Sequence, residues 1–341
     1  MSGNSNISRN TGIDLLRFFG AFLVVCIHVG FSSRPYIEPV TRTIVPVFFM
    51  ISGFFYSFDP VRQKRQIIKI FRLLVVSCLI FAAWEIIRTL SDGGSVLPLI
   101  HGWFRAEHLK NFLLFNLIPF KGHLWYLSAL LYVLILARLL GKRTIKFLYW
   151  LIPVLLVLNG ALGTYSTFLF GENLNILYTR NFLLMGLPFF LLGNFVSEHE
   201  ERFRKVPPFA LLLVSLVLIY AETWWLGNRV GFGNRDFYCF GLFVSLSLFL
   251  IARREYPVYL HPVSEKLAGW GRRYALWVYI LHPIAVDLLP EILEGIFGYN
   301  RAIVRVYFHI APLLVFLFSL ALALIAEKLM SLSEKKSKTA A

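Results

Sequence analysis

The chain has 341 residues, of which 57% are hydrophobic and 16% aromatic, and its mean hydropathy is +0.67. Soluble domains are usually about 45–50% apolar, so this composition indicates a membrane protein. The net charge of +15 would be compatible with nucleic-acid binding. The Lys and Arg residues are concentrated in alternate loops between the apolar segments, as is typical of membrane proteins. This distribution argues against a nucleic-acid partner.

Ten apolar segments are long enough, or nearly long enough, to cross a bilayer as helices, which takes about 20 residues. They lie at 13–32, 41–58, 71–91, 124–140, 146–163, 181–197, 208–226, 237–252, 273–290 and 303–326. We predict an all-α fold, a polytopic membrane helix bundle with about ten transmembrane helices. One membrane domain is expected over residues 10–328, followed by a short cytoplasmic tail over 329–341.

Lys and Arg residues are distributed unevenly between alternate loops. With the N-terminus inside, 22 of the 34 fall on the cytoplasmic side and 11 on the opposite side, and Arg17 lies within a span. Positive residues accumulate in cytoplasmic loops, so both termini are predicted to be cytoplasmic. We expect a multi-pass protein of the inner or plasma membrane, in contact with membrane lipids.

The first apolar segment contains two ionisable residues, Arg17 and His28. They are 11 positions apart, which places them on one face of a helix about 16 Å apart along its axis. Asp14 precedes Arg17 by three positions and is predicted to pair with it. Because a charge inside the bilayer is costly, such a polar stripe indicates a function and is expected to face protein or a cavity.

Four motifs follow one another along the chain. They are IDLLRFFGAFLVVCIH with Asp14, Arg17 and His28; RTIVPVFFMISGFF with Arg42, Pro46, Ser52 and Gly53; GHLWYL with His123 and Trp125; and LWVYILHP with His282 and Pro283. In this order, together with ten spans, they resemble the acyltransferase-3 family of integral-membrane acyltransferases. The resemblance extends over residues 10–328.

The resemblance implies that an acyl group passes from cytoplasmic acyl-CoA, acetyl-CoA by family analogy, to a hydroxyl of an extracytoplasmic carbohydrate. His28 and Arg17 would be the catalytic residues. Substrate-binding roles would fall to Asp14, Arg42, Arg72, His123, Trp125 and His282. No proline follows the basic stretch of Arg72, where the family pattern often has one, so its role is the least supported. No metal and no bound cofactor are expected.

Several alternatives stay open at the level of sequence. His28 could act as general base, since neutral His suits proton transfer near pH 7, or it could accept the acyl group and pass it on. It could also only form an interhelical hydrogen bond. His123 and Trp125 could line the acceptor site or belong to an interfacial belt. The His282–Pro283 pair could mark a helix kink or a site.

Functions other than acyl transfer are also compatible with the sequence. A transporter or flippase of a glycan or lipid-linked precursor would use the same intramembrane charges to line a path, and a sensor or scaffold would use them structurally. Transport predicts movement of a substrate without covalent change. A structural role predicts that mutation alters protein abundance more than any flux.

Overall fold

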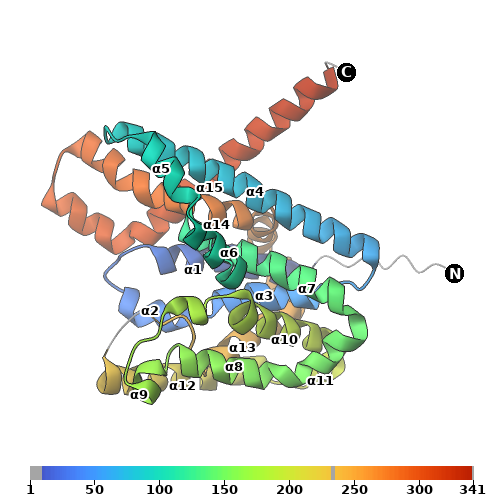
Figure 1. Cartoon of the computed structure of the whole chain (residues 1–341). Helices are drawn as coiled ribbons and strands as arrows, with labels where there is room; N and C mark the ends of the chain where they lie inside the picture. Colours follow the sequence, from blue (N-terminus) through green and yellow to red (C-terminus); the bar gives the residue numbers. More distant parts are fainter. Residues whose placement is uncertain (1–9, 232–234, 340–341) are drawn as a thin grey trace. The chain divides into compact units, whose positions relative to one another are not determined.

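The computed structural model describes residues 10–231 and 235–339, and the regular elements in these ranges are all helices. The chain separates into two compact units. Unit 1 comprises Met1–Ile44 and Ser247–Ala341, and unit 2 comprises Val45–Leu246. Figure 1 shows the helices of both units with their labels. The all-α expectation is therefore confirmed for the described residues.

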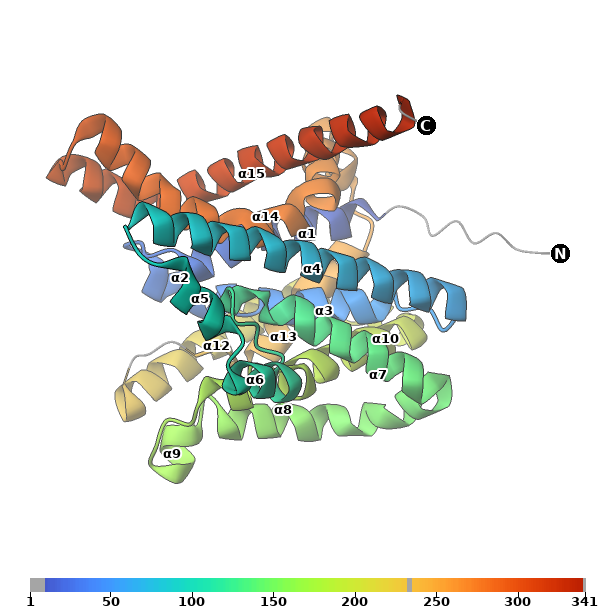
Figure 2. The same ribbon diagram turned by 45° about the horizontal axis from the view of Figure 1, so that its top comes forward.

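Unit 1 is built on α1 (Thr11–His28), α14 (Pro262–Phe297) and α15 (Arg301–Thr339), with the short α2 (Arg34–Thr41) after α1. Helix α14 packs against both α1 and α15, and the α14–α15 hairpin is visible in Figures 1 and 2. The core between these helices contains mainly small and β-branched side chains. Its members are Ala21, Val25, Val29, Tyr274, Val278, Ala285, Ala311, Val315, Phe316, Leu320 and Ala323.

Glycine allows α1 to approach its neighbours closely. A Cβ on Gly271 of α14 would overlap the carbonyl oxygen of Asp14, and one on Gly12 would overlap the carbonyl oxygen of Ala252. Small residues at such crossings are typical of membrane helices, which associate by close packing and interhelical hydrogen bonds. The Gly271 crossing holds the N-terminal half of α1, and with it the polar residues of its first turns, against α14.

Unit 2 contains the remaining helices. They are α3 (Ile44–Phe54), α4 (Pro60–Ser91), α5 (Val96–Trp103), α6 (Ala106–Phe115), α7 (Trp125–Phe147), α8 (Leu151–Leu162), α9 (Ser166–Phe170), α10 (Leu187–Glu198), α11 (Glu200–Arg204), α12 (Pro208–Val230) and α13 (Gly241–Arg253), of which α3 and α13 cross the unit boundary. Two glycines join α3 and α10, since a Cβ on Gly53 would overlap the carbonyl of Phe190 and one on Gly193 that of Met50. The Ser-Gly motif thus serves close helix approach.

Helix boundaries follow local chemistry. Gly141 has φ 71° and ψ 175°, a non-helical conformation inside α7. This break comes one residue after the predicted span 124–140. Asn116 ends α6 in the left-handed region with φ 50°, so the stretch 111–120 is the end of a short helix and a turn. The predicted span 41–58 differs from the structure, where the helical stretch begins earlier at Arg34 and is interrupted near Arg42.

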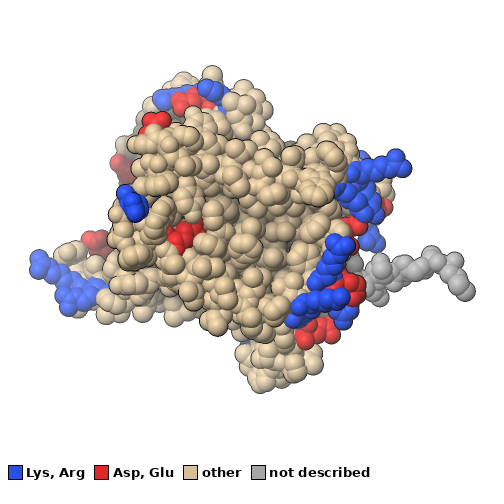
Figure 3. All heavy atoms as spheres, turned by 90° about the horizontal axis from the view of Figure 1, so that it is seen from below, with Lys and Arg blue, Asp and Glu red and all other residues tan. Residues whose placement is uncertain are grey.

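Seven helical stretches within the described residues are long and apolar enough to cross a membrane, and two shorter apolar helices lie at Phe182–Glu198 and Gly241–Arg253. One of the seven, Gly122–Leu162, covers two of the predicted segments. On the face seen in Figure 3, most of the surface belongs to uncharged residues, and the charged side chains form small groups. This distribution suits a protein surrounded by lipid.

Candidate functional site

Two histidines from distant parts of the sequence meet in unit 1. His28 is the last residue of α1, and His282 lies in the middle of α14. Their ring centroids are 4.9 Å apart, with an angle of 37° between the ring planes. His28 is exposed, whereas His282 is completely buried. The structure thus brings together two of the predicted site residues, with the buried ring of His282 beside the exposed ring of His28.

The ring of His282 is oriented by its own helix. Its Nδ1 lies 2.7 Å from the carbonyl oxygen of Tyr279. In a regular helix that carbonyl would accept from the N–H four residues later, but residue 283 is proline and has no N–H. The freed carbonyl accepts from the imidazole instead, so Nδ1 carries the proton and Nε2 of the neutral ring is left as the acceptor.

Asp14 and Arg17 form the predicted ion pair in the first turns of α1. The Arg17 Nη1 to Asp14 Oδ1 distance is 2.7 Å. Asp14 is buried, and the Arg17 side chain keeps 34% of its surface exposed. The guanidinium is anchored by one nitrogen and retains exposed surface, which suits contact with a further anionic group. The pairing is confirmed, and the contact with a substrate stays a prediction.

Arg42 has a carboxylate partner that the sequence interpretation missed. Its Nη2 lies 2.7 Å and its Nε 3.2 Å from Glu38 Oε1, across one turn at the end of α2. Both side chains are largely buried. The spacing of four residues was a usable signal, since opposite charges at this distance face each other on a helix. Any substrate-binding role of Arg42 would therefore involve Glu38.

The other predicted residues lie in unit 2. His123 is buried in the turn before α7, with its ring centroid 5.0 Å from that of Phe81 of α4. Trp125 begins α7, is also buried, and lies 6.3 Å from the Phe49 ring. Arg72 is exposed on α4. His123 and Trp125 are packed inside this unit, and the structure groups Arg72 with neither of them. The substrate-binding roles of these three residues stay predictions.

Unit 1 therefore holds the polar groups that could perform chemistry: an exposed imidazole backed by an oriented one, and an anchored guanidinium on the same helix. Such a pair can accept a proton from a hydroxyl or act as a nucleophile. Within the described residues, no group of three or more His, Cys, Asp or Glu side chains is placed to hold a metal ion.

Apolar helices of spanning length and ionisable side chains within them define a multi-pass membrane protein with a polar site. The chain matches the acyltransferase-3 family, described as an acyltransferase domain, over residues 10–328 and belongs to that family. The resemblance drawn from the four motifs is thereby confirmed.

The curated relatives that the chain matches are named as racemases and not as acyltransferases. The chain is 27% identical over 310 residues to a serine/alanine racemase of Enterococcus gallinarum, covering 82% of this chain and 41% of that protein. Two amino-acid racemases of Enterococcus faecalis are 28% and 27% identical over 220 and 318 residues. These matches cover 57% and 83% of this chain and 29% and 42% of the relatives. The chain thus spans less than half the length of these relatives. No solved structure matches it.

Proposed function

We propose that this protein is a membrane O-acyltransferase that moves an acyl group, acetyl in the simplest case, from cytoplasmic acyl-CoA to a hydroxyl of an extracytoplasmic carbohydrate such as a surface polysaccharide. The observation that supports this most directly is the meeting of His28 and His282 on α1 and α14. A family of acyltransferases supplies the reaction class. The histidine pair supplies groups that such a reaction needs.

In the direct route, His28 is the general base. The acceptor hydroxyl oxygen attacks the thioester carbon while its proton passes to the neutral imidazole of His28. The C–S bond then breaks, and the CoA thiolate leaves and takes up that proton. Because His282 is fixed with Nε2 as an acceptor, an imidazolium N–H of His28 that turned toward it would be stabilised. His282 is therefore a positioning residue in this proposal.

In the relay route, the imidazole of His28 attacks the thioester first. CoA thiol leaves, and an acyl-imidazole remains that the acceptor hydroxyl attacks in a second step. Both routes use the exposed ring of His28 and give the same products, an ester of the acceptor and CoA thiol. They differ in whether an acylated protein can be isolated when no acceptor is present, which rapid quenching with labelled acetyl-CoA would reveal.

Arg17 is proposed to hold the acyl donor. Its guanidinium can meet a phosphate oxygen of CoA while Asp14 keeps it in place. Arg17 and His28 are separated by about 16 Å along α1, so the long flexible arm of CoA would have to bridge that distance. With both termini cytoplasmic and about ten spans, Arg17 lies in the inner half of the first span and His28 in the outer half.

The test compares wild-type protein with His28→Ala for acetyl esters on the surface glycan, at matched protein levels. His309→Ala is the control, because His309 is an exposed histidine of α15 in the same unit whose Nδ1 lies 2.8 Å from the carbonyl of Arg305. We expect loss of acetylation in His28→Ala and normal acetylation in His309→Ala. Persistent acetylation in His28→Ala would remove the proposed role of this residue.

Transport is the competing function, because ionisable side chains within membrane helices also line substrate paths. Membranes incubated with acetyl-CoA labelled in the acetyl group separate the two functions. Label that appears in glycan, and only in membranes that contain the protein, supports acyl transfer. Movement of a glycan precursor without incorporation of label supports transport.

A further inference from the structure

Helix α4 of unit 2 carries a row of basic side chains at its N-terminal end. The row consists of four exposed cations that recur every three or four residues, Arg62, Arg65, Lys69 and Arg72. Side chains with this spacing lie on one face of a helix, one above the other, over a length of about 15 Å. In the described part of the chain, none of the four forms an ion pair with a carboxylate. The row is therefore a strip of uncompensated positive charge.

The same face of α4 continues as an apolar surface. Val76 and Leu79 follow Arg72 by four and seven positions, and both are exposed. Ile68 and Val75 flank this face and are also exposed. All of them belong to a helix that is long and apolar enough to cross a membrane. Basic side chains thus give way to aliphatic ones along a single helix face, as the headgroups of a bilayer give way to its acyl chains.

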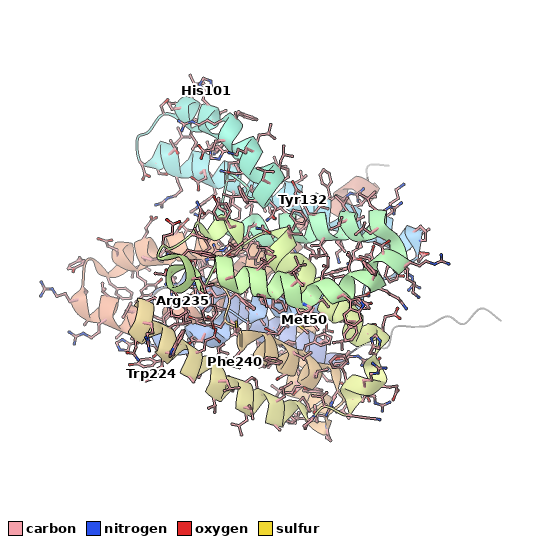
Figure 4. The ribbon with its side chains drawn as sticks, turned by 60° about the horizontal axis from the view of Figure 1, so that its bottom comes forward. Met50, His101, Tyr132, Trp224, Arg235 and Phe240 are labelled. Carbon is pink, nitrogen blue, oxygen red and sulfur yellow. The ribbon has the colours of Figure 1, made fainter. Side chains whose placement is uncertain are left out.

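The opposite face of α4 is packed against protein. Its buried residues are Gln63, Ile70, Leu74, Ser77 and Phe81, and they lie about 120–180° around the helix from Arg65. Within unit 2, α4 is in contact with α7, which Tyr132 marks in Figure 4. This packing fixes the rotation of α4 about its axis, so the basic row and its apolar continuation stay directed outward.

Helix α7 adds positive charge at the same end of α4. Arg138 donates from Nη1 to the carbonyl oxygen of Pro60 at 3.0 Å, which places its side chain beside the first turn of α4. The Lys142 ammonium lies 5.8 Å from the centre of the Phe58 ring, just before α4 begins. A carbonyl oxygen and an aromatic ring carry no net charge, so neither contact neutralises its cation.

Two carboxylates near this end leave the charge balance positive. Asp59 caps α4 by accepting from the backbone N–H of Arg62 at 2.9 Å. Glu198 pairs with Lys146 at 2.5 Å and lies 3.8 Å from Lys142. Neither carboxylate forms an ion pair with the basic row, so the row can meet an anion from outside the chain.

We propose that this face of α4 binds an anionic phospholipid, with the phosphate headgroup against the basic row and an acyl chain along Val76 and Leu79. Guanidinium and ammonium groups both donate to phosphate oxygens, and basic residues beside a membrane span attract anionic lipids. A soluble phosphate compound would use only the basic part of the face, whereas a lipid uses both parts. The proposal does not depend on the proposed acyl transfer, whose histidines lie in unit 1.

Lipid binding can be measured on the full chain purified in detergent, by thermal unfolding during titration with phosphatidylglycerol or with phosphatidylcholine of the same acyl chains. A lipid that binds only the folded protein raises the unfolding temperature, and phosphatidylcholine has no net charge. We expect phosphatidylglycerol to stabilise wild type more than phosphatidylcholine does. In Arg65→Gln/Lys69→Gln we expect about thirtyfold weaker binding of phosphatidylglycerol, equivalent to about 2 kcal/mol for two basic residues.

The matched control removes the same charge elsewhere in unit 2. Arg202→Gln/Arg204→Gln acts on the short helix α11, where Arg204 pairs with Glu201 at 3.3 Å, and we expect it to bind phosphatidylglycerol as wild type does. Arg65→Lys/Lys69→Arg keeps both charges of the row and should also bind normally. Because each affinity comes from the lipid dependence within one variant, a change in stability without lipid does not affect the comparison.

Three results would overturn the proposal. The first is equal stabilisation of wild type by the two lipids, and the second is equal loss of binding in the two double-Gln variants. The third is displacement of phosphatidylglycerol by excess CoA, because the basic row would then belong to a soluble phosphate ligand. Acetyl transfer to glycan is a separate measurement, so failure of this lipid site and failure of the proposed function are distinguishable.

Discussion

His282 Nδ1 lies 2.7 Å from the carbonyl oxygen of Tyr279, whose helical donor position is occupied by Pro283. The proline therefore does not simply interrupt α14. It releases a carbonyl that selects the tautomer of the adjacent histidine, and it does so next to the ring of His28. The backbone irregularity expected at the His-Pro pair is thus present, and the role of His282 in a site stays a prediction.

Replacing Pro283 with Ala is expected to reduce acyl transfer without reducing stability. The new N–H at position 283 competes for the Tyr279 carbonyl, so His282 is no longer held in one tautomer. We expect kcat to fall by about tenfold, or about 1.4 kcal/mol in the barrier, with little change in the KM for acyl-CoA. Steady-state kinetics and thermal unfolding of the same preparations provide the measurement.

Pro290→Ala is the matched control for that variant. Pro290 lies two turns further along α14. Its missing N–H leaves the carbonyl of residue 286 without a helical donor and does not affect the Tyr279 carbonyl. We expect wild-type kinetics. If both proline variants lose activity equally, the effect belongs to the shape of the helix and not to the His282 tautomer.

Gly271→Ala is expected to destabilise unit 1. Its Cβ would overlap the Asp14 carbonyl oxygen and lie 2.8 Å from the backbone nitrogen of Phe18. Overpacking of this kind costs about 1–3 kcal/mol. Thermal unfolding should occur at a lower temperature than in Gly269→Ala, since Gly269 of the same helix has open space at its Cβ position. Equal stability of the two variants would show that α1 and α14 can separate at no cost.

Arg17 variants separate anchoring from donor binding. Arg17→Gln leaves the buried Asp14 carboxylate without its cation, and we expect it to lose about 1–3 kcal/mol of stability. Arg17→Lys keeps the charge but not the forked geometry. We therefore expect near-normal stability with a raised KM for acyl-CoA. A normal KM in a stable Arg17→Lys protein would restrict Arg17 to a structural role.

Glu198 provides a test of pH dependence outside the predicted spans. The ammonium of Lys146, 2.5 Å from Glu198 Oε2, lowers the pKa of Glu198 below its usual value of 4.5. The stabilisation is therefore present above the unfolded pKa and is lost as the pH falls through the lower folded pKa. For an exposed pair it amounts to about 0.2–1 kcal/mol. Glu198→Gln should be less stable than wild type at pH 7, and the difference should shrink as the pH is lowered below 4.5, by thermal unfolding in detergent.

Sequence patterns predicted the helices well because hydropathy and helix breakers act locally. The apolar segments fall on helical stretches, and the predicted end at residue 140 precedes the break at Gly141. The Asp14–Arg17 pair was also predictable, because it spans one helical turn. Glu38 beside Arg42 had the same kind of signal and was overlooked.

What the sequence by itself determined is the membrane class, the helical segments, the family motifs and the polar residues of the first span. Only the tertiary structure decided which side chain meets His28, since His282 lies 254 positions away and local periodicity says nothing about such pairs. The close crossings at Gly53, Gly193 and Gly271 belong to the same category. Contacts between distant segments depend on how whole helices fit against one another, and that fit is a property of the folded chain.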